Sequence, residues 1–471
     1  MNMFQTNDTI CATATAQGGA IGVIRVSGSE AITITDKIFT AAGKDSKPLA
    51  ERKAYTLNFG HIKNDKDEII DEVLVSLFRA PHSYTGEDSI EISCHGSSYI
   101  LRQVMQLLMA NGCRAAGPGE FTQRAFLNGK MDLSQAEAVA DLIASSSAAT
   151  HRLAMNQMRG GFSKELTVLR EKLLHLTSLM ELELDFSDHE ELEFADRSEL
   201  EAIANQIESV ISRLVESFSV GNAIKNGVPV AIIGETNAGK STLLNALLNE
   251  ERAIVSDIHG TTRDVIEDTM NVGGVLFRFI DTAGIRETTD TIESMGIERS
   301  FQKLDQADIV LWVVDQTQAE EQYKLLGSKI LPRCEGKQLI LVLNKADIAS
   351  SSTVDYATAF EGLTESAKII PISAKKKEGV QQLEDLLVEA ASIPEISQND
   401  LVVTNARHYE ALSGALEAIH RVQEGLAMQL SGDFVSQDLR ECLFHLAEIV
   451  GGEITTDEVL GNIFKHFCVG K

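Results

Sequence analysis

The sequence predicts a multidomain α/β protein in which an α+β region, an all-α region and a doubly wound α/β region follow one another. From Ile10 to about Gly119, short apolar stretches alternate with turn residues, which is typical of an α+β domain rich in strands. From Phe121 to about Val220, apolar residues recur with the helical period. From about Gly227 to Ala391, strand-like and helical segments alternate, as they do in a doubly wound sheet.

The individual elements follow from the same patterns. In the first region Ile21 to Val26 and Val73 to Phe78 are strand-like runs, and Pro118-Gly119 marks its end. The second region is predicted to form long helices, because its apolar positions fall on one helical face. These positions include Ala136, Val139, Ala140 and Leu142, then Leu166, Leu169, Leu173 and Leu176.

The helical pattern returns after Pro394. This last stretch is short for an independent domain, so we expect it to pack onto the earlier helices, with the α/β region inserted between them. The predicted domains are residues 1–119, 120–226, 227–391 and 392–471.

Composition limits the possible functions and locations. A net charge of −27 over 471 residues argues against a broad surface that grips nucleic acid, so an RNA partner needs help from another protein. The six cysteines form no C-x-x-C pair and no metal-ligand cluster, which predicts reduced thiols and no structural zinc. With no signal-peptide pattern and no run near the ~18 apolar residues of a membrane span, we expect a soluble cytoplasmic protein.

The most informative motif is a complete phosphate-binding loop, Gly234 to Thr242, which reads Gly-Glu-Thr-Asn-Ala-Gly-Lys-Ser-Thr. It stands between the apolar run Pro229 to Ile233 and a helical pattern that begins near Leu243. Such a loop aims backbone N–H groups at phosphates, its lysine adds a point charge on the β and γ oxygens, and its serine ligates Mg²⁺. We therefore predict a nucleotide site with Lys240 and Ser241 in these roles.

Three further motifs each follow a strand-like run and predict that the nucleotide is GTP. They are Asp281-Thr-Ala-Gly284, Asn344-Lys-Ala-Asp347 and Ser373-Ala-Lys375. A carboxylate at Asp347 accepts from both N1–H and the 2-amino group of guanine, a pairing that adenine does not offer. Asp281 is expected to hold the Mg²⁺ water shell and Gly284 to donate to the γ-phosphate.

Two residues in this region depart from small regulatory GTPases. Ile285 follows Gly284 where many of them carry a glutamine that orients water, so the catalytic polar group must come from elsewhere in the chain or from a partner. Asn237 offers a carbonyl beside the β/γ bridge, either as a ligand of a monovalent cation or simply as a residue that holds the turn. Ser256 to Asp264 is the candidate switch, with Thr262 as the second Mg²⁺ ligand.

Other polar clusters favour structural interpretations. The acidic stretch Glu181 to Asp196 is interpreted as a solvated face with apolar residues packing inward, rather than as a cation site. His95 lacks a third ligand at useful spacing, so we expect a hydrogen-bonded role.

The whole set of motifs resembles the MnmE (TrmE) family of tRNA-modification GTPases. The resemblance rests on the G-x-x-N-A-G-K-S loop, Gly260-Thr-Thr-Arg-Asp264, Asp281-Thr-Ala-Gly-Ile-Arg286, Pro118-Gly-Glu-Phe-Thr-Gln-Arg-Ala-Phe-Leu-Asn128 and Phe467-Cys-Val-Gly-Lys471. It covers essentially the whole chain. It implies an N-terminal domain similar to the tetrahydrofolate-binding part of aminomethyltransferases, a helical domain and an inserted P-loop GTPase domain.

The resemblance also implies the function and the partners. Family members are homodimers joined through their N-terminal domains, and they work with a flavoprotein of the MnmG (GidA) type in a heterotetramer or larger complex. Together they add an aminomethyl or carboxymethylaminomethyl group to C5 of the wobble uridine, position 34, of tRNA, with a folate as one-carbon donor. FAD is expected only on the partner, because this chain has no G-x-G-x-x-G after a strand.

The resemblance assigns site residues by motif. Folate contacts fall on Arg25, Glu91, Lys130 and Lys471, K⁺ ligands on Asn237, Ser256, Ile258 and Thr261, and Mg²⁺ ligands on Ser241 and Thr262. Glu293 is favoured over Glu287 as the water-positioning acid, and Lys240 and Cys468 complete the catalytic set. The GTP-binding set is Asn237, Ala238, Gly239, Lys240, Ser241, Thr242, Ser256, Asp257, Ile258, His259, Gly260, Thr261, Thr262, Asp281, Thr282, Ala283, Gly284, Asn344, Lys345, Asp347, Ser373, Ala374 and Lys375.

Two alternatives stay open from the residues. Cys468 is either an apolar packing residue in a docked tail or a participant in the modification chemistry. The chain as a whole is alternatively a GTPase switch in ribosome assembly, against which its acidic balance counts, or a folate-binding scaffold whose GTPase is only regulatory.

Overall fold

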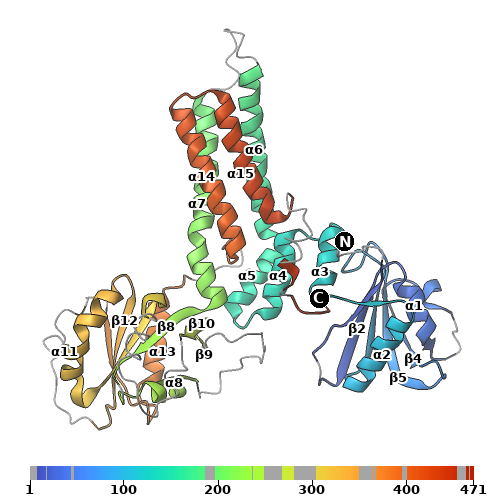
Figure 1. Cartoon of the computed structure of the whole chain (residues 1–471), viewed down its shortest axis with the longest axis horizontal. Coiled ribbons are helices and arrows are strands. Elements are labelled where there is room, and N and C mark those ends of the chain that lie inside the picture. Colours follow the sequence, from blue (N-terminus) through green and yellow to red (C-terminus); the bar gives the residue numbers. More distant parts are fainter. Residues whose placement is uncertain are drawn as a thin grey trace. The chain divides into compact units, whose positions relative to one another are not determined.

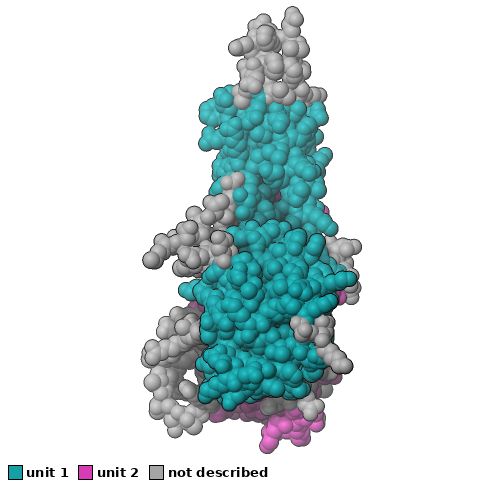
Figure 2. All heavy atoms as spheres, turned by 90° about the vertical axis from the view of Figure 1, so that its right-hand side faces the viewer, with its two compact units in different colours: residues 1–143, 155–209, 411–471 teal, residues 144–154, 210–410 magenta. Residues whose placement is uncertain are grey.

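The structure is a computed structural model (Figure 1). It describes residues 8–16, 18–43, 47–185, 197–235, 237–248, 268–280, 304–348, 363, 367–394, 400–452, 463–465 and 467–470. The chain divides into two compact units, which Figure 2 colours separately. Unit 1 comprises residues 1–143, 155–209 and 411–471, and unit 2 comprises residues 144–154 and 210–410.

Unit 1 contains a seven-stranded sheet in the order β3-β4-β5-β6-β2-β1-β7. Neighbouring strands are antiparallel except β1 and β7, which are parallel. Helices α1 (Ala31–Ile38) and α2 (Ser98–Ala110) cover one face, where their apolar side chains share a core with the strands (Figure 1). The strands are β1 (Ile10–Thr13), β2 (Ile21–Ser27), β3 (Phe39–Ala41), β4 (Thr56–Lys63), β5 (Ile69–Phe78), β6 (Ser89–His95) and β7 (Arg114–Ala115).

The opposite face of this sheet, which we call the open face, exposes apolar side chains. Alternate residues of a strand point to opposite faces, so the residues between the buried ones in β4 and β5 point away from the helices. Phe59 and Leu74 lie directly opposite each other on adjacent strands and are 51% and 39% exposed. Leu57 and Ile21 are exposed as well, so part of this face is available for a partner.

The remainder of unit 1 is helical, as the periodicity predicts. Helices α6 and α15 pack side by side, and the Glu208 carboxylate on α7 lies 3.6 Å from His420 on α14. The helices after the sheet are α3 (Glu120–Leu127), α4 (Leu133–Ala144), α5 (Ala148–Met158), α6 (Gly161–Asp185), α7 (Arg197–Asn226), α14 (Ala406–Ala427) and α15 (Gly432–Val450), of which α4, α5, α7 and α14 extend into unit 2.

Unit 2 is built on a six-stranded sheet in the order β13-β12-β11-β8-β10-β9. All neighbours are parallel except the β9–β10 pair. Helices α8 (Lys240–Leu248) and α13 (Val380–Ala391) cover one face and α11 (Ala319–Ile330) covers the other. The strands are β8 (Val228–Ile233), β9 (Asp268–Val272), β10 (Val275–Phe279), β11 (Ile309–Asp315), β12 (Gln338–Asn344) and β13 (Lys368–Pro371).

Burial on both faces explains why these strands read as continuous apolar runs. Six consecutive residues of β11, Ile309 to Val314, are buried. Trp312 of this strand has no exposed surface, and its ring stacks on Tyr323 at 5.1 Å between centroids.

The predicted fold class is confirmed, with an α+β N-terminal part, a helical part and a doubly wound P-loop part. The bounds of the four predicted domains stay predictions. No helix in the described part of the chain is long and apolar enough to cross a membrane.

Candidate functional site

The phosphate loop joins β8 to α8 and depends on two glycines. Gly234 has φ of +147°, and a Cβ atom there would lie 2.0 Å from the Val313 carbonyl oxygen. Gly239 has φ of +95°, and a Cβ atom there would lie 2.1 Å from the Asn344 amide nitrogen. Glycine is therefore required at both positions, because any side chain would displace the loop from the neighbouring strands.

Lys240 begins α8 and turns back over this loop. Its ammonium group donates to the carbonyl oxygens of Gly234 at 2.8 Å and Glu235 at 2.7 Å. Burial lowers the pKa of Lys240, and the nearby Glu235 carboxylate acts in the opposite direction. The amine is thus held inside the loop, which is the place required for a contact with the phosphates of a nucleotide.

Asn344, at the end of β12, connects the phosphate loop to a second loop. Its side-chain amide donates to the Ala238 carbonyl oxygen at 2.9 Å, and its side-chain oxygen accepts from the Ala374 N–H at 3.0 Å. The side chain is buried, so both polar ends are satisfied by backbone. Asn344 therefore brings three of the sequence motifs together at the carboxyl edge of the sheet.

Asp347 is oriented by the third motif. The Ser373 hydroxyl donates to Asp347 Oδ1 at 2.8 Å, and the Lys376 ammonium lies 3.6 Å from Oδ2. The hydrogen bond from Ser373 lowers the pKa of Asp347, and Lys376 acts in the same direction. The carboxylate is thus kept ionised and acceptor-only, which suits it to two N–H donors on one edge of a base.

A second polar site lies on the open face of the N-terminal sheet. Arg25 on β2 and Glu91 on β6 are directly opposite in register, and Nε and Nη2 of Arg25 both donate to Glu91 Oε1, at 3.0 and 2.9 Å. The guanidinium carbon lies 5.1 Å from the ring centre of Tyr84 and 5.6 Å from that of Phe121. The two rings and the carboxylate fix the guanidinium plane.

Comparisons with known proteins identify the family to which the chain belongs. A family model described as the GTP-binding protein TrmE N-terminus matches residues 9–130, and one described as the MnmE helical domain matches residues 133–468. A tRNA modification GTPase MnmE from Bacteroides fragilis is 71% identical over 466 residues, which cover 98% of this chain and 99% of the relative. The chain belongs to the MnmE family of tRNA-modification GTPases.

More distant relatives carry the same name. The MnmE protein of Christiangramia forsetii is 52% identical over 476 residues, which cover 99% of each chain. Among solved structures, the FeoB G-domain from Methanococcus jannaschii is 30% identical and covers 35% of this chain and 97% of its own, with a TM-score of 0.27. That score is too low for the structural match to support an argument. As a member of the MnmE family, this chain is a GTP hydrolase.

Lys130 contacts the loop between β5 and β6. The side-chain carbons Cγ and Cδ of Lys130 lie beside Gly86, so close that an added Cβ at Gly86 would be 3.3 Å from each of them. The Lys130 ammonium group donates to the Pro81 carbonyl oxygen at 2.9 Å. Gly86 belongs to the same loop as Tyr84, whose ring contacts Arg25. The loop between β5 and β6 therefore connects Lys130 to the Arg25–Glu91 pair.

The C-terminal tail of this MnmE-family chain docks beside the same sheet. Val469 pairs with Pro118 in an isolated β-bridge, and the Gly119 N–H donates to the Cys468 carbonyl oxygen at 3.2 Å. Gly470, with φ of +95°, approaches so closely that a Cβ there would lie 2.4 Å from the Thr13 carbonyl oxygen. Cys468 itself is exposed, whereas the other five cysteines are buried.

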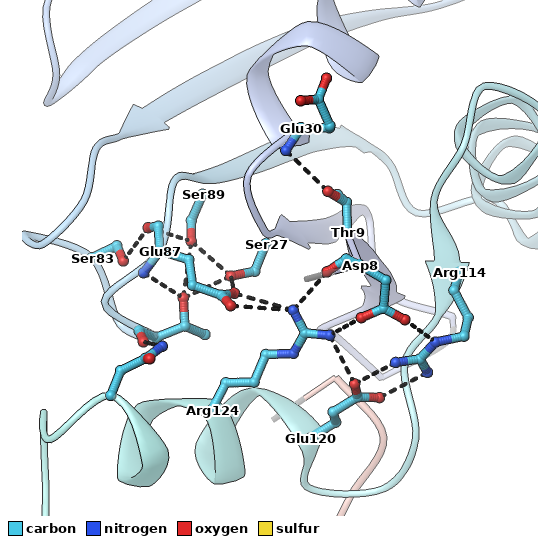
Figure 3. A network of polar contacts seen from close by, with 12 residues as sticks. Asp8, Thr9, Ser27, Glu30, Ser83, Glu87, Ser89, Arg114, Glu120 and Arg124 are labelled. Carbon is cyan, nitrogen blue, oxygen red and sulfur yellow. Dashed lines mark hydrogen bonds and ion pairs between the residues drawn. The ribbon is translucent and has the colours of Figure 1, made fainter. Parts of the chain in front are cut away.

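An ionic network lies at the start of α3, and the sequence motifs did not reveal it (Figure 3). Arg124 is 5% exposed and pairs with three carboxylates, those of Asp8, Glu87 and Glu120. Arg114 also binds Asp8 and Glu120. Arg124 lies inside the Pro118 to Asn128 motif, yet its partners Asp8 and Glu87 are distant in sequence, so only the fold brings them together.

The charges of this MnmE network shift one another's pKa values. Burial acts to raise the pKa of Asp8 and of Glu120, but hydrogen bonds from Arg114 and the charge of Arg124 outweigh it, so both pKa values lie below their ordinary range. Hydrogen bonds to Glu120 and Asp8 raise the pKa of Arg114. Asp8, Glu120 and Arg114 are thus ionised near neutral pH.

Several predicted MnmE site residues lie outside the described residues. Within the described residues, no group of three or more His, Cys, Asp or Glu side chains could hold a metal ion. The positions outside the described residues are Ser256, Asp257, Ile258, His259, Gly260, Thr261, Thr262, Asp281, Thr282, Ala283, Gly284, Ile285, Glu287, Glu293 and Lys471.

Proposed function

We propose that this chain is a K⁺-dependent GTPase that acts with a flavoprotein partner on tRNA. The pair adds an aminomethyl or carboxymethylaminomethyl group to C5 of the wobble uridine and takes the one-carbon unit from a folate. The proposal is supported by the combination of three features in one chain. The phosphate loop and the Asn344 motif meet at one edge of the unit 2 sheet, and Arg25 pairs with Glu91 on the N-terminal sheet. The chain is also 71% identical to an MnmE protein over 98% of its length.

The phosphate loop suits a nucleoside triphosphate with Mg²⁺. Gly234 and Gly239 let the loop pack closely against Val313 and Asn344, and the Lys240 ammonium is held in the same loop. Lys240 would neutralise charge on the β- and γ-phosphates, and Asp347 would accept from the guanine edge. Ser241 and Thr262 would hold Mg²⁺, which supplies charge neutralisation on the phosphate oxygens.

Asn237 supports the assignment of a K⁺ site. It is exposed at the phosphate loop and has φ of +69°, a conformation that asparagine tolerates better than most residues. Its side-chain carbonyl would coordinate K⁺ together with backbone groups of Ser256, Ile258 and Thr261. Glu293 would position the attacking water, because Ile285 offers no polar group.

The Arg25 region suits a folate. The paired guanidinium and carboxylate, with the Lys130 ammonium nearby, offer cations for glutamate carboxylates and an acceptor for the donor edge of a pterin. Lys471 would add a further cation, and Cys468 lies in the tail that docks beside β1. The folate supplies the one-carbon unit, and these residues would bind and orient it.

The open face of the N-terminal sheet supports a homodimer. Leu57, Phe59 and Leu74 are exposed on the adjacent strands β4 and β5, and such a patch is a frequent interaction surface. A second copy would bury the part of this face formed by β4 and β5, and contact between the GTPase domains of the two copies would complete the catalytic site.

The K⁺ part of the proposal is tested by GTP hydrolysis in KCl and in NaCl at equal ionic strength. We expect hydrolysis to fall sharply in NaCl while the Kd for a non-hydrolysable GTP analogue stays within about twofold. Glu293→Ala should lower kcat steeply with little effect on that Kd, and Glu287→Ala serves as the matched control. Equal turnover in the two salts, or a larger loss from Glu287→Ala, contradicts these assignments.

The tRNA part is tested by mass spectrometry of wobble uridines from cells in which the gene for this chain is deleted and replaced by a variant gene. Removal of residues 468–471 should abolish the modification and leave K⁺-stimulated hydrolysis near normal, because the nucleotide motifs lie between Gly234 and Lys375. Cys468→Ser separates thiol chemistry from tail docking, since a fully modified tRNA in this variant would leave only a packing role for the sulfur. Loss of hydrolysis on truncation would instead show that the tail supports the GTPase.

A further inference from the structure

Asp315 stands at the carboxyl end of β11 and belongs to none of the nucleotide motifs. It lies directly opposite Asn344 in the parallel β11–β12 register. Its Oδ2 accepts from the ammonium of Lys345 at 2.6 Å. An acid outside the motifs thus binds the central lysine of the Asn344 to Asp347 motif.

The Asp315 carboxylate is itself held in place. Oδ1 accepts from the backbone N–H of Thr317 at 3.0 Å and from its hydroxyl at 2.7 Å. The backbone N–H of Asp315 donates to the side chain of Gln322 at 2.9 Å, and Gln322 is buried. One carboxylate oxygen therefore caps the turn after β11, and the other is directed at Lys345.

Lys345 is constrained at both ends. Its backbone has φ of +65°, and its carbonyl oxygen accepts from the Ile348 N–H at 3.0 Å. The next residue, Ala346, donates its N–H to the Ile372 carbonyl oxygen at 3.0 Å. Because the backbone is fixed and the ammonium is bound to Asp315, the four-carbon stem between them keeps few of its free rotamers.

The ion pair is less exposed than an ordinary surface pair. The side chains of Asp315 and Lys345 are 13% and 34% exposed. Partial burial acts to raise the pKa of Asp315, but the hydrogen bonds from Lys345 and Thr317 outweigh it, so the pKa lies below its usual range. The carboxylate is therefore charged throughout the neutral pH range, and the pair persists there.

We propose that Asp315 is a positioning residue for guanine-nucleotide binding, which holds the stem of Lys345 against the place that the base occupies. The proposal rests on the proposed function, because it requires that this chain binds a guanine nucleotide beside Asp347. A lysine side chain that is already ordered loses little further conformational entropy when the nucleotide binds. The ion pair should therefore improve nucleotide affinity and leave the rate of the chemical step unchanged.

Asp315→Asn tests the proposal with little disturbance. The amide oxygen still accepts from Thr317 and so keeps the turn, whereas the amide nitrogen no longer attracts the Lys345 ammonium. We expect the Kd for GDP and the KM for GTP to rise roughly 3- to 10-fold, with kcat at saturating GTP unchanged. Asp308→Asn is the control, since Asp308 lies exposed just before the other end of the same strand.

A double-mutant cycle with Lys345→Met decides whether Asp315 acts through the lysine. Methionine keeps an apolar stem and removes the charge. In the Lys345→Met background, Asp315→Asn should leave the Kd for GDP unchanged within about twofold. An equal loss of affinity in both backgrounds, or no loss in either, overturns the proposal.

Two further measurements distinguish a loss of folding from a loss of binding. Far-UV circular dichroism and thermal unfolding show whether each variant folds, and Asp315→Glu, which restores the charge, should recover part of the GDP affinity. If the unaltered chain fails to bind GDP, the proposed function fails. If the unaltered chain binds GDP and Asp315→Asn binds it equally well, only the role of Asp315 is refuted.

Discussion

The two sheets of this molecule bury their faces differently and present their polar groups differently. In unit 2 the sheet is mostly parallel and carries helices on both faces, so its strands are almost continuously buried. In unit 1 the sheet is mostly antiparallel and one face carries α1 and α2, while exposed Phe59 and Leu74 lie on the other. The same type of element therefore offers two kinds of surface.

This difference decides where binding residues can stand. A sheet covered on both faces leaves only its ends accessible: Asp315 and Asn344 are the last residues of their strands, and Lys240 begins the helix after the loop that follows β8. A sheet with an open face can place polar side chains along its strands, as Arg25 and Glu91 show in the middle of β2 and β6. Predictions for the two units can thus be tested separately.

The largest effect is expected at Arg124. Arg124→Met leaves the carboxylates of Asp8, Glu87 and Glu120 without their shared buried cation, which should cost about 3–5 kcal/mol in the free energy of unfolding. Urea unfolding followed by circular dichroism measures the loss. Arg102→Met, an exposed arginine on α2, is the control, and equal losses in the two variants would show that the network contributes nothing special.

A change of similar size, in the free energy of nucleotide binding and not of unfolding, is expected at the carboxyl edge of the parallel sheet. Asp347→Asn removes the carboxylate that we propose accepts from two guanine N–H groups, so GTP affinity should fall by about 10²- to 10³-fold, or roughly 3–4 kcal/mol. Xanthosine triphosphate carries an oxygen where guanine has its amino group, so the variant should prefer it. Calorimetric titration with both nucleotides provides the test, and retained preference for GTP would exclude Asp347 from base recognition.

The open face should respond to charge without loss of fold. If a second copy covers this face, Phe59→Glu places a carboxylate in the interface. The free energy of self-association should then weaken by about 2 kcal/mol, which is a rise of roughly 30-fold in Kd. Analytical ultracentrifugation over a concentration series measures it. Phe434→Glu on α15, where the phenylalanine is also exposed, is the control; an unchanged dimer with Phe59→Glu would place the interface elsewhere.

The smallest effect concerns acid. Because the pKa of folded Glu120 lies below that of the unfolded chain, about 4.3, Glu120 stabilises the fold above that pH. This contribution is lost as the pH falls through the lowered folded pKa. The difference in urea midpoint between the parent and Glu120→Gln should therefore be larger at pH 7 than at pH 3, whereas exposed Glu51→Gln should show no such trend. A difference that is constant with pH would contradict this role.

The parts of the molecule that sequence predicts well are local. The phosphate loop needs only nine consecutive residues, Gly234 to Thr242, and the structure places it between a strand and a helix as predicted. In the run Val73 to Phe78 the alternate residues Val73, Val75 and Leu77 are buried in a core, whereas every residue of the run Leu339 to Leu343 is buried. Helical periodicity likewise predicts α4 and α6.

The parts that sequence did not reveal depend on contacts between distant residues. Arg124 binds Asp8 across 116 positions, and Lys345 binds Asp315 across 30. A single aspartate after an apolar run carries no motif, so only the parallel pairing of β11 and β12 identifies its partner. Strand β9 was also missed, because its sequence Asp-Thr-Met-Asn-Val is too polar to resemble a buried strand.

Trp312 gives the molecule a built-in spectroscopic asymmetry. The chain has one tryptophan, and it lies buried in unit 2, one residue before Val313, whose carbonyl oxygen faces Gly234 of the phosphate loop. Intrinsic indole emission is therefore silent about the N-terminal sheet. If the two units melt at different temperatures, fluorescence and circular dichroism will give different midpoints, and the difference will identify which unit opens first.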